Sequence, residues 1–206
     1  MTGPPTPLRV GRDALLLECA GPEQVRATAA AALARRESGL LVCDEVVPGA
    51  ATVLLDGVVD RNAVLAELGT WADVEVVDDE DRAVELPVAY DGPDLDEVAR
   101  LTGLSTSEVV DLHLSTELRV AFCGFAPGFA YLAGLPEVLH VPRRDEPRTR
   151  VPAGAVGLAG EFCGVYPRES PGGWQLLGTT RTTLWDPSSA EPALLRPGTA
   201  VRFTRD

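Results

Sequence analysis

Residues 120–180 read VAFCGFAPGFAYLAGLPEVLHVPRRDEPRTRVPAGAVGLAGEFCGVYPRESPGGWQLLGTT. The stretch is rich in Gly and Pro, yet it holds all but one of the Phe residues and two of the three Tyr residues of the chain. Linkers combine Gly and Pro with few aromatics. We therefore expect the aromatic side chains to supply a core here, and Gly and Pro to set turns at fixed places.

From residue 119 onward, the pattern predicts short strands separated by Gly or Pro turns, with little helix. The predicted strands cover residues 119–123, 155–159, 164–166, 174–179, 183–185 and 201–203. Such a density of short strands is typical of a barrel or a sandwich. A further strand is expected at 85–90. Two short helices follow it, and the second begins at a capping box of Ser105 and Glu108.

The N-terminal part of the chain has a different periodicity. It predicts, in order, a strand at 8–20, a helix from Pro22, strands at 40–47 and 52–55, a helix capped by Asp60, and a strand at 74–77. This order is that of the ferredoxin-like split βαβ arrangement, in which two helices cover one face of a four-stranded sheet. The acidic run at 78–81 marks a boundary, so we expect two domains, residues 1–81 and 82–206.

The chain is acidic, with a formal net charge of −13, which opposes binding to nucleic acid or anionic lipid. Residues 95–113 resemble a helix-turn-helix, but the second helix carries Glu108 and Asp111 and no Lys or Arg, so DNA binding is disfavoured. No apolar run is long enough to span a bilayer, no signal peptide is recognisable, and the four cysteines are scattered. We therefore expect a cytoplasmic protein with reduced thiols and without a metal site.

Four arginines lie in one loop of this acidic chain: Arg143, Arg144, Arg148 and Arg150. A guanidinium presents a rigid fork that matches carboxylate or phosphate oxygens, and neighbouring prolines reduce its conformational freedom. The cluster therefore predicts a site for an anion or an acidic partner. The alternative is a solvated loop in which the arginines pair with the two acidic residues beside them, and the spacing alone fits both.

Three segments carry a specific resemblance to a known family. They read GFAPGFAYL at 124–132, PRRDEPRTRVPAG at 142–154 and GVYPRESPGGW at 164–174. Together and in this order they resemble the KipI family, whose members are called the B subunit of 5-oxoprolinase or allophanate hydrolase subunit 1 and are related to one half of the carboxyltransferase domain of urea amidolyase. The resemblance implies a cyclophilin-like β-barrel for residues 82–206. The expected fold class is therefore α+β, with a ferredoxin-like domain followed by this barrel.

The resemblance also implies a function, the ATP-dependent opening of 5-oxoproline to glutamate. It implies two partner proteins, a KipA-like protein (the C subunit of 5-oxoprolinase) and a LamB/YcsF-type protein (the A subunit). The active cleft would lie where two related barrels meet, so ATP, with Mg²⁺, would be bound jointly with the KipA-like protein and this chain would be inactive alone. Two alternatives stay open. KipI is named as an inhibitor of a sensor histidine kinase, and the allophanate hydrolase name implies a carboxyltransferase-type protein that acts on urea-derived amides.

The candidate catalytic residues are His113, Arg143 and Arg148. The resemblance supports His113, because the family has a histidine just before the strand that leads into the first motif; its alternative role is to interact with the dipole at a helix C-terminus. The candidate substrate- or nucleotide-binding residues come from the three motifs: Gly124, Phe125, Pro127, Gly128, Tyr131, Pro152, Ala153, Gly154, Tyr166, Ser170, Gly172, Gly173 and Trp174. The glycines fit a backbone that approaches a ligand or one that only turns, and the aromatics fit a pocket wall or a core.

The chain departs from the family pattern at one place. The family usually has GxQTG before the (I/V)YP motif, and this chain has Phe162 and Cys163 at the positions of Gln and Thr. If the two polar groups touch substrate, the pocket of this protein is changed. If they only pack, the replacement is neutral.

Overall fold

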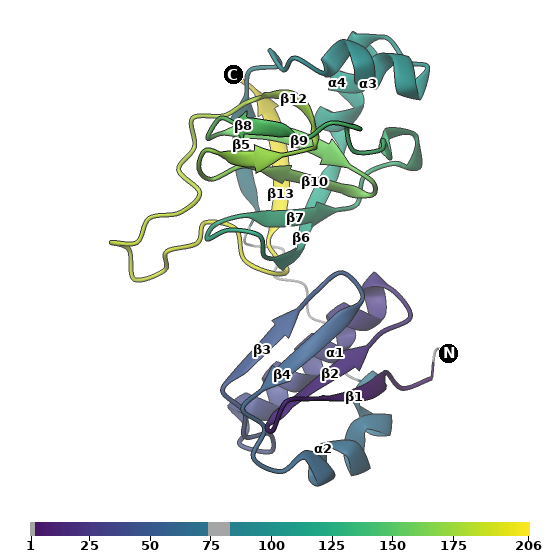
Figure 1. Cartoon of the computed structure of the whole chain (residues 1–206), viewed down its shortest axis with the longest axis vertical. Coiled ribbons are helices and arrows are strands. Elements are labelled where there is room, and N and C mark those ends of the chain that lie inside the picture. Colours follow the sequence, from purple (N-terminus) through teal and green to yellow (C-terminus); the bar gives the residue numbers. More distant parts are fainter. Residues whose placement is uncertain (1–2, 74–82) are drawn as a thin grey trace. The chain divides into compact units, whose positions relative to one another are not determined.

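The computed structural model of the chain describes residues 3–73 and 83–206. The chain forms two compact units, Met1–Asp78 and Asp79–Asp206, each with a hydrophobic core of its own (Figure 1). The division falls within the acidic run at 78–81, where the sequence predicts a domain boundary.

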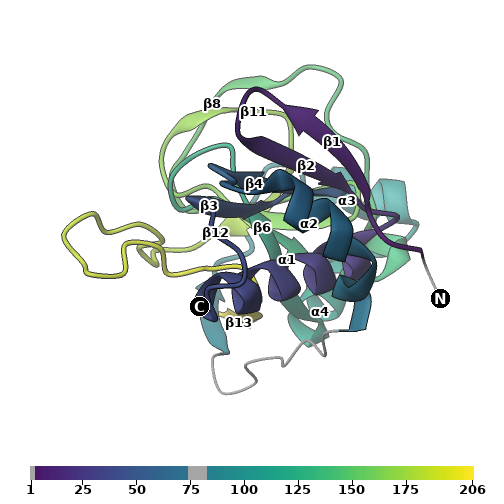
Figure 2. The same ribbon diagram turned by 90° about the horizontal axis from the view of Figure 1, so that it is seen from below.

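The N-terminal unit is an antiparallel sheet with a long helix on one face (Figures 1 and 2). Its elements are β1 (Thr6–Val10), β2 (Ala14–Glu18), α1 (Pro22–Glu37), β3 (Glu45–Pro48), β4 (Thr52–Asp56), α2 (Arg61–Glu67) and the 3₁₀ helix η1 (Leu68–Asp73), and the strand order is β1-β2-β4-β3. Leu15 and Leu17 of β2 and Leu55 of β4 are fully buried in the core that includes the apolar residues of α1. The cap of α2 is confirmed, because the Asp60 carboxylate accepts a hydrogen bond from the Ala63 N–H at 3.0 Å.

The ferredoxin-like prediction for this unit is not confirmed. The expected single strand at 8–20 is wrong, because Gly11, at φ +57°, turns the chain and makes β1 and β2 a hairpin. The expected last strand at 74–77 lies outside the described residues. In the described sheet, β1 occupies the edge beside β2, the position that the predicted arrangement gives to that last strand. One part of the prediction holds. Helix α1 connects β2 to β3, and β4 lies between β2 and β3 in the sheet.

The C-terminal unit is built around a barrel-like sheet. Its elements are β5 (Val84–Val88), α3 (Leu95–Thr102), α4 (Thr106–Ser115), β6 (Glu117–Cys123), β7 (Ala130–Ala133), the 3₁₀ helix η3 (Glu137–Leu139), β8 (Arg148–Val151), β9 (Ala155–Ala159), β10 (Phe162–Val165), β11 (Ser170–Gly172), β12 (Gln175–Thr179) and β13 (Ala200–Arg205). Seven strands follow the order β12-β9-β10-β7-β6-β13-β5. The two edges meet where Ala89 and Thr179 exchange backbone hydrogen bonds of 2.9 and 2.8 Å, so the predicted barrel is confirmed; its cyclophilin-like character stays a prediction.

Smaller features of this unit agree only in part with the sequence. The capping box of α4 is confirmed, because the Ser105 N–H donates to Glu108 Oε2 at 2.7 Å and the Glu108 N–H donates to Ser105 Oγ at 3.2 Å. The predicted strand at 183–185 is wrong. That segment lies in the long loop between β12 and β13 that extends from the barrel in Figures 1 and 2, and it contributes one bridge, from Trp185 to Ala193. Among the described residues, no helix combines the length and apolar character needed to cross a bilayer.

Candidate functional site

The centre of the site is a buried carboxylate shared by two arginines. Asp94, at the start of α3, is 2% exposed. Its Oδ1 accepts hydrogen bonds from Arg144 Nη1 at 2.9 Å and from Arg148 Nη2 at 2.7 Å, and its Oδ2 accepts one from the Leu176 N–H at 2.7 Å. Because a buried charge is costly unless it is paired and hydrogen-bonded, these three contacts make the carboxylate tolerable. They join the start of α3, the loop that carries Arg144, the first residue of β8 and β12; Arg148 and Arg150 therefore lie on a strand and not in the loop expected from the sequence.

Backbone pairing with β12 places Asp94. The Gly92 N–H donates to the Leu177 carbonyl at 3.0 Å, and the Asp94 N–H donates to the Leu176 carbonyl at 3.1 Å. The segment before α3 therefore runs along β12 like a short extra strand, which fixes the direction of the Asp94 side chain. That carboxylate makes no cap hydrogen bond to its own helix, so it is committed to the arginines and to Leu176.

The arginine loop is clamped to the segment that precedes β12. The Arg144 N–H donates to the Gly173 carbonyl at 2.8 Å, and Gln175 Nε2 donates to the Pro142 carbonyl at 3.3 Å. These two contacts hold Arg144 and Gln175 beside each other. The predicted residue Gly173 therefore acts through its backbone carbonyl, which orients the arginine loop.

Hydrogen-bonding capacity remains unused in this cluster. Among the described residues, three buried side-chain atoms of the site have no partner: Arg144 Nε, Arg148 Nη1 and Gln175 Oε1. Gln175 is only 4% exposed, and two guanidiniums share the single carboxylate of Asp94. Since buried polar groups are nearly always paired, the two donors and one acceptor indicate a place for a further polar group.

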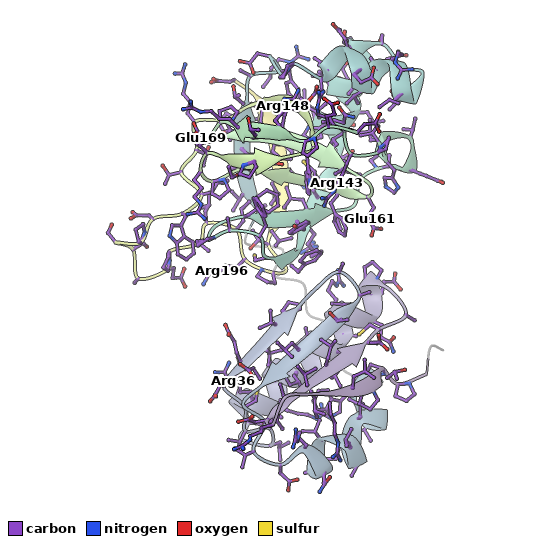
Figure 3. All side chains as sticks on the ribbon, in the orientation of Figure 1. Arg36, Arg143, Arg148, Glu161, Glu169 and Arg196 are labelled. Atoms are coloured by element: carbon purple, nitrogen blue, oxygen red, sulfur yellow. The ribbon has the colours of Figure 1, made fainter. Side chains whose placement is uncertain are left out.

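An open groove of about 640 Å³ adjoins this cluster. Its charged and polar wall includes Asp94, Glu97, Arg143, Arg144, Glu146 and Gln175. Arg143 is exposed and has no hydrogen bond or ion pair with another described residue. Arg148 instead lines a second, smaller cavity of about 190 Å³ together with Pro152. The two predicted arginines, labelled in Figure 3, therefore line different cavities rather than one pocket.

The structure does not bring His113 to this cluster. His113 is fully buried in the barrel unit, where its ring stacks on Phe203 with a centroid distance of 4.5 Å. Its Nδ1 lies 2.8 Å from the Tyr90 hydroxyl oxygen and its Nε2 lies 3.4 Å from Cys163 Sγ. Burial lowers the pKa of His113 to about 4 and raises the pKa of the Cys163 thiol. This setting favours a neutral, structural imidazole, and a catalytic role for His113 stays a prediction.

The low pKa of His113 predicts a pH dependence of stability. The unfolded chain has a histidine pKa near 6.5, so between about pH 4 and pH 6.5 it binds a proton that the folded chain does not. The free energy of unfolding is therefore expected to have its full value above about pH 6.5. It is expected to decrease as the pH falls from there toward about 4, by up to about 1.4 kcal/mol per pH unit.

The titration of the His113 ring, followed by NMR, tests this prediction directly. The chain has only two histidines, so the substitution His140→Gln leaves a single imidazole to observe. We expect a midpoint near pH 4 for His113. A midpoint at the ordinary histidine value would contradict the buried, neutral state.

The predicted aromatic residues form a cluster within the barrel unit. Tyr166 and Trp174 are 2% and 4% exposed, and Phe129 packs edge-on against both rings as well as against Tyr131. These side chains are core rather than an open pocket wall. Phe125 differs, because it is 59% exposed and holds a left-handed backbone at φ +67°, a conformation that costs a residue with a Cβ about 1–2 kcal/mol.

The remaining predicted residues serve mainly as turns. Gly124, Pro127 and Ala153 are exposed, and the Ser170 hydroxyl donates to a backbone carbonyl of its own turn at 3.4 Å. The three glycines at 128, 154 and 172 are packed so closely that an added Cβ would press on neighbouring atoms. Their geometry supports the interpretation in which the backbone turns tightly.

Two residues of the site, Asp94 and Gln175, are not predicted from the sequence as members of it. Arg144 is predicted only as one member of the arginine cluster. One signal could have pointed to Asp94, because an acidic residue in the same domain as an arginine-rich stretch can form an ion pair with it. Which acid pairs with which arginine depends on the tertiary fold.

The two residues that depart from the family pattern, Phe162 and Cys163, pack against other side chains of the barrel unit. Phe162 contacts the rings of Phe122 and Tyr131, and Cys163 is fully buried beside His113. Neither residue lines the two cavities described above.

This placement predicts that Cys163→Thr is well tolerated. The Thr hydroxyl can take the place of Sγ beside His113 Nε2, so we expect the free energy of unfolding to change by less than about 1 kcal/mol. The matched variant Cys163→Val removes the partner of a buried nitrogen and is expected to cost about 1–3 kcal/mol. Urea denaturation of both variants measures the difference, and equal stabilities would show that this contact contributes nothing.

The amino-acid sequence of the chain matches a known family. Residues 5–195 match the family described as Carboxyltransferase domain, subdomain C and D, and the chain belongs to this family. The chain is 55% identical over 136 residues to the B subunit of 5-oxoprolinase from Escherichia coli O157:H7, covering 65% of this chain and 62% of that protein. It is 44% identical over 156 residues to the B subunit of 5-oxoprolinase from Haemophilus influenzae, covering 74% of this chain and 73% of that protein. The resemblance drawn from the three motifs is confirmed.

Solved structures agree on the fold. A conserved uncharacterized protein from Pyrococcus horikoshii is 33% identical with a TM-score of 0.60, covering 98% of this chain and 97% of that chain. The urea carboxylase of Kluyveromyces lactis, at 21% identity and a TM-score of 0.72, covers 98% of this chain and 22% of that chain and shares the fold alone. The chain spans less than two thirds of the length of the Escherichia coli relative.

Proposed function

We propose that this chain is the B subunit of an ATP-dependent 5-oxoprolinase. The observation that carries the proposal is the 55% identity to a protein of that name. The reaction converts 5-oxoproline, ATP and water into glutamate, ADP and phosphate. An unstrained lactam is a poor electrophile. Bound ATP would supply the activation by phosphorylating the amide oxygen, and the residues of this chain would position the lactam for attack by water.

The residues of this chain contribute charge and position. The Asp94–Arg144–Arg148 cluster holds two guanidiniums in fixed directions, and Arg143 adds a third at the groove wall. Burial raises the pKa of the Tyr166 hydroxyl, while a backbone hydrogen bond with Trp174 and the charges of Arg143 and Arg148 act in the opposite direction. Such an arrangement suits the binding of an anionic substrate or intermediate.

The charge of the groove argues against ATP being held by this chain alone. The wall of the groove carries Glu97, Asp145 and Glu146, which would repel the phosphates of a nucleotide. We propose that the nucleotide and its Mg²⁺ are bound jointly with a KipA-like protein, the C subunit of 5-oxoprolinase, and that a LamB/YcsF-type protein completes the enzyme.

Reconstitution tests the proposal. This chain is mixed with its KipA-like and LamB/YcsF-type partners, ATP and 5-oxoproline, and glutamate release is followed while each protein is left out in turn. We expect glutamate only from the complete mixture. An assembled complex that releases no glutamate would overturn the assignment. Binding to a histidine kinase dimerisation domain, or turnover of allophanate, would then identify which alternative holds.

A further inference from the structure

Two residues of the groove beside Asp94 keep unused hydrogen-bonding capacity. Arg144 Nε and Gln175 Oε1 are both buried and have no partner among the described residues. Both residues line the groove of about 640 Å³, and each is fixed by a hydrogen bond to the backbone of the other residue's segment. A ligand that satisfies both atoms must itself offer an acceptor and a donor.

The charge of the groove limits the kind of ligand. Three guanidiniums and four carboxylates line it, and the exposed Glu97 and Arg100 form an ion pair with each other at 2.6 Å. A polyanion would gain contacts with the arginines but would face the remaining acidic side chains. A ligand with a single negative charge and an N–H group can pair its charge with an arginine and donate its N–H to an acceptor of the groove.

We propose that this groove binds a small carboxylic acid with an N–H group beside its carboxylate, and that it does not bind nucleotide phosphates. The carboxylate accepts hydrogen bonds from Arg144 Nε and from the exposed Arg143, and the N–H donates to Gln175 Oε1. The ring nitrogen of 5-oxoproline is bonded to the carbon that carries the carboxylate, so this substrate has the required pattern. The proposal rests on the proposed function for the choice of 5-oxoproline as the ligand.

Asp94 determines which nitrogen of the Arg144 guanidinium is left for a ligand. Its Oδ1 accepts a hydrogen bond from Arg144 Nη1 at 2.9 Å, and Arg144 Nε stays unpaired. Gln175 is oriented in the same way, because its Nε2 is engaged by the Pro142 carbonyl and its Oε1 is left unpaired. The two side chains are therefore preorganised, which lowers the entropic cost of binding.

Ligand binding by the purified chain, measured by NMR titration, tests the proposal without any turnover. The probes are 5-oxoproline, pyrrolidone (the same lactam without the carboxylate), N-methyl-5-oxoproline and ATP with Mg²⁺. We expect 5-oxoproline to bind at least about tenfold more tightly than either lactam analogue, because each analogue lacks one charge-assisted or buried hydrogen bond. We expect ATP with Mg²⁺ not to displace it.

Two variants locate the site. Arg144→Lys keeps the charge beside Asp94 but removes the Nε donor, and Gln175→Met keeps the volume but removes the acceptor. Each is expected to weaken 5-oxoproline binding about tenfold or more, whereas Arg202→Gln, at an exposed arginine that pairs with Glu117, is expected to have no effect.

The outcomes separate this inference from the proposed function. Binding of 5-oxoproline that both variants weaken supports the inference, even if the reconstituted mixture releases no glutamate. Equal binding of pyrrolidone, unchanged binding by both folded variants, or displacement by the nucleotide would overturn the inference. Glutamate release would then leave the proposed function intact, with substrate held elsewhere.

Discussion

Replacing Asp94 with Asn is expected to lower the free energy of unfolding by about 2–4 kcal/mol. The substitution keeps the size of the side chain but removes the charge that two guanidiniums share. Arg144 and Arg148, whose side chains are 34% and 22% exposed, would then carry partly buried charges without a counter-charge. Asn must also turn its oxygen either to the arginines or to the Leu176 N–H, so one of these contacts is lost.

Urea denaturation with a matched control measures this effect. Asp96 lies two residues further along the chain, in α3, and is exposed, so Asp96→Asn is expected to change stability by less than about 0.5 kcal/mol. A double-mutant cycle of Asp94→Asn with Arg148→Gln should show positive coupling, because the second substitution removes one of the stranded charges. Equal stability of the Asp94 and Asp96 variants would contradict the central role given to this carboxylate.

Gly154→Ala is expected to have the largest effect of the substitutions considered, about 4 kcal/mol or more, or to give no folded protein. Gly154 has a left-handed backbone at φ +80°, and an added Cβ would overlap the carbonyl oxygen of Thr180. That carbonyl cannot move freely, because the Thr180 N–H donates to the Gly154 carbonyl at 2.9 Å and the Gly154 N–H donates to the Tyr166 carbonyl at 2.7 Å.

Gly160→Ala separates the steric effect from backbone strain. Gly160 also has a left-handed backbone, at φ +57°, but no atom lies within 4 Å of an added Cβ. We expect a cost of about 1 kcal/mol for this variant, which is the strain alone. Thermal unfolding of the two variants gives the comparison, and similar losses would show that contact with Thr180 does not explain the need for glycine at 154.

Much of the barrel unit could be predicted from the sequence, because its signals are local. The capping box of Ser105 and Glu108 and the Gly- and Pro-bounded strands from residue 119 follow from short-range patterns. The N-terminal unit was less predictable. A loosely alternating apolar run at 8–20 looks like one strand, and the turn at Gly11 that makes it a hairpin carries little signal of its own.

The candidate site was predictable only as a collection of residue types. The arginine-rich stretch indicated either a site for an anion or acidic partner or a loop paired with the acidic residues beside it. In the structure, Arg148 pairs with a buried carboxylate from another part of the chain. The partner, Asp94, is 54 residues away in the sequence, and Gln175 approaches the loop only because β12 closes the barrel. His113 shows the opposite case, because its residue type suggested chemistry and the fold gives it a buried position against Phe203.

In the proposed 5-oxoprolinase, this chain holds the carboxylate of 5-oxoproline. The most direct test is the ratio of kcat/KM for 5-oxoproline to kcat/KM for pyrrolidone, measured in the reconstituted enzyme with the unsubstituted chain and with Arg144→Lys. We predict a ratio of about 10 or more for the unsubstituted chain and a loss of most of this preference in the variant, since both changes remove the same contact. An undiminished preference in an active Arg144→Lys enzyme would contradict this role of Arg144.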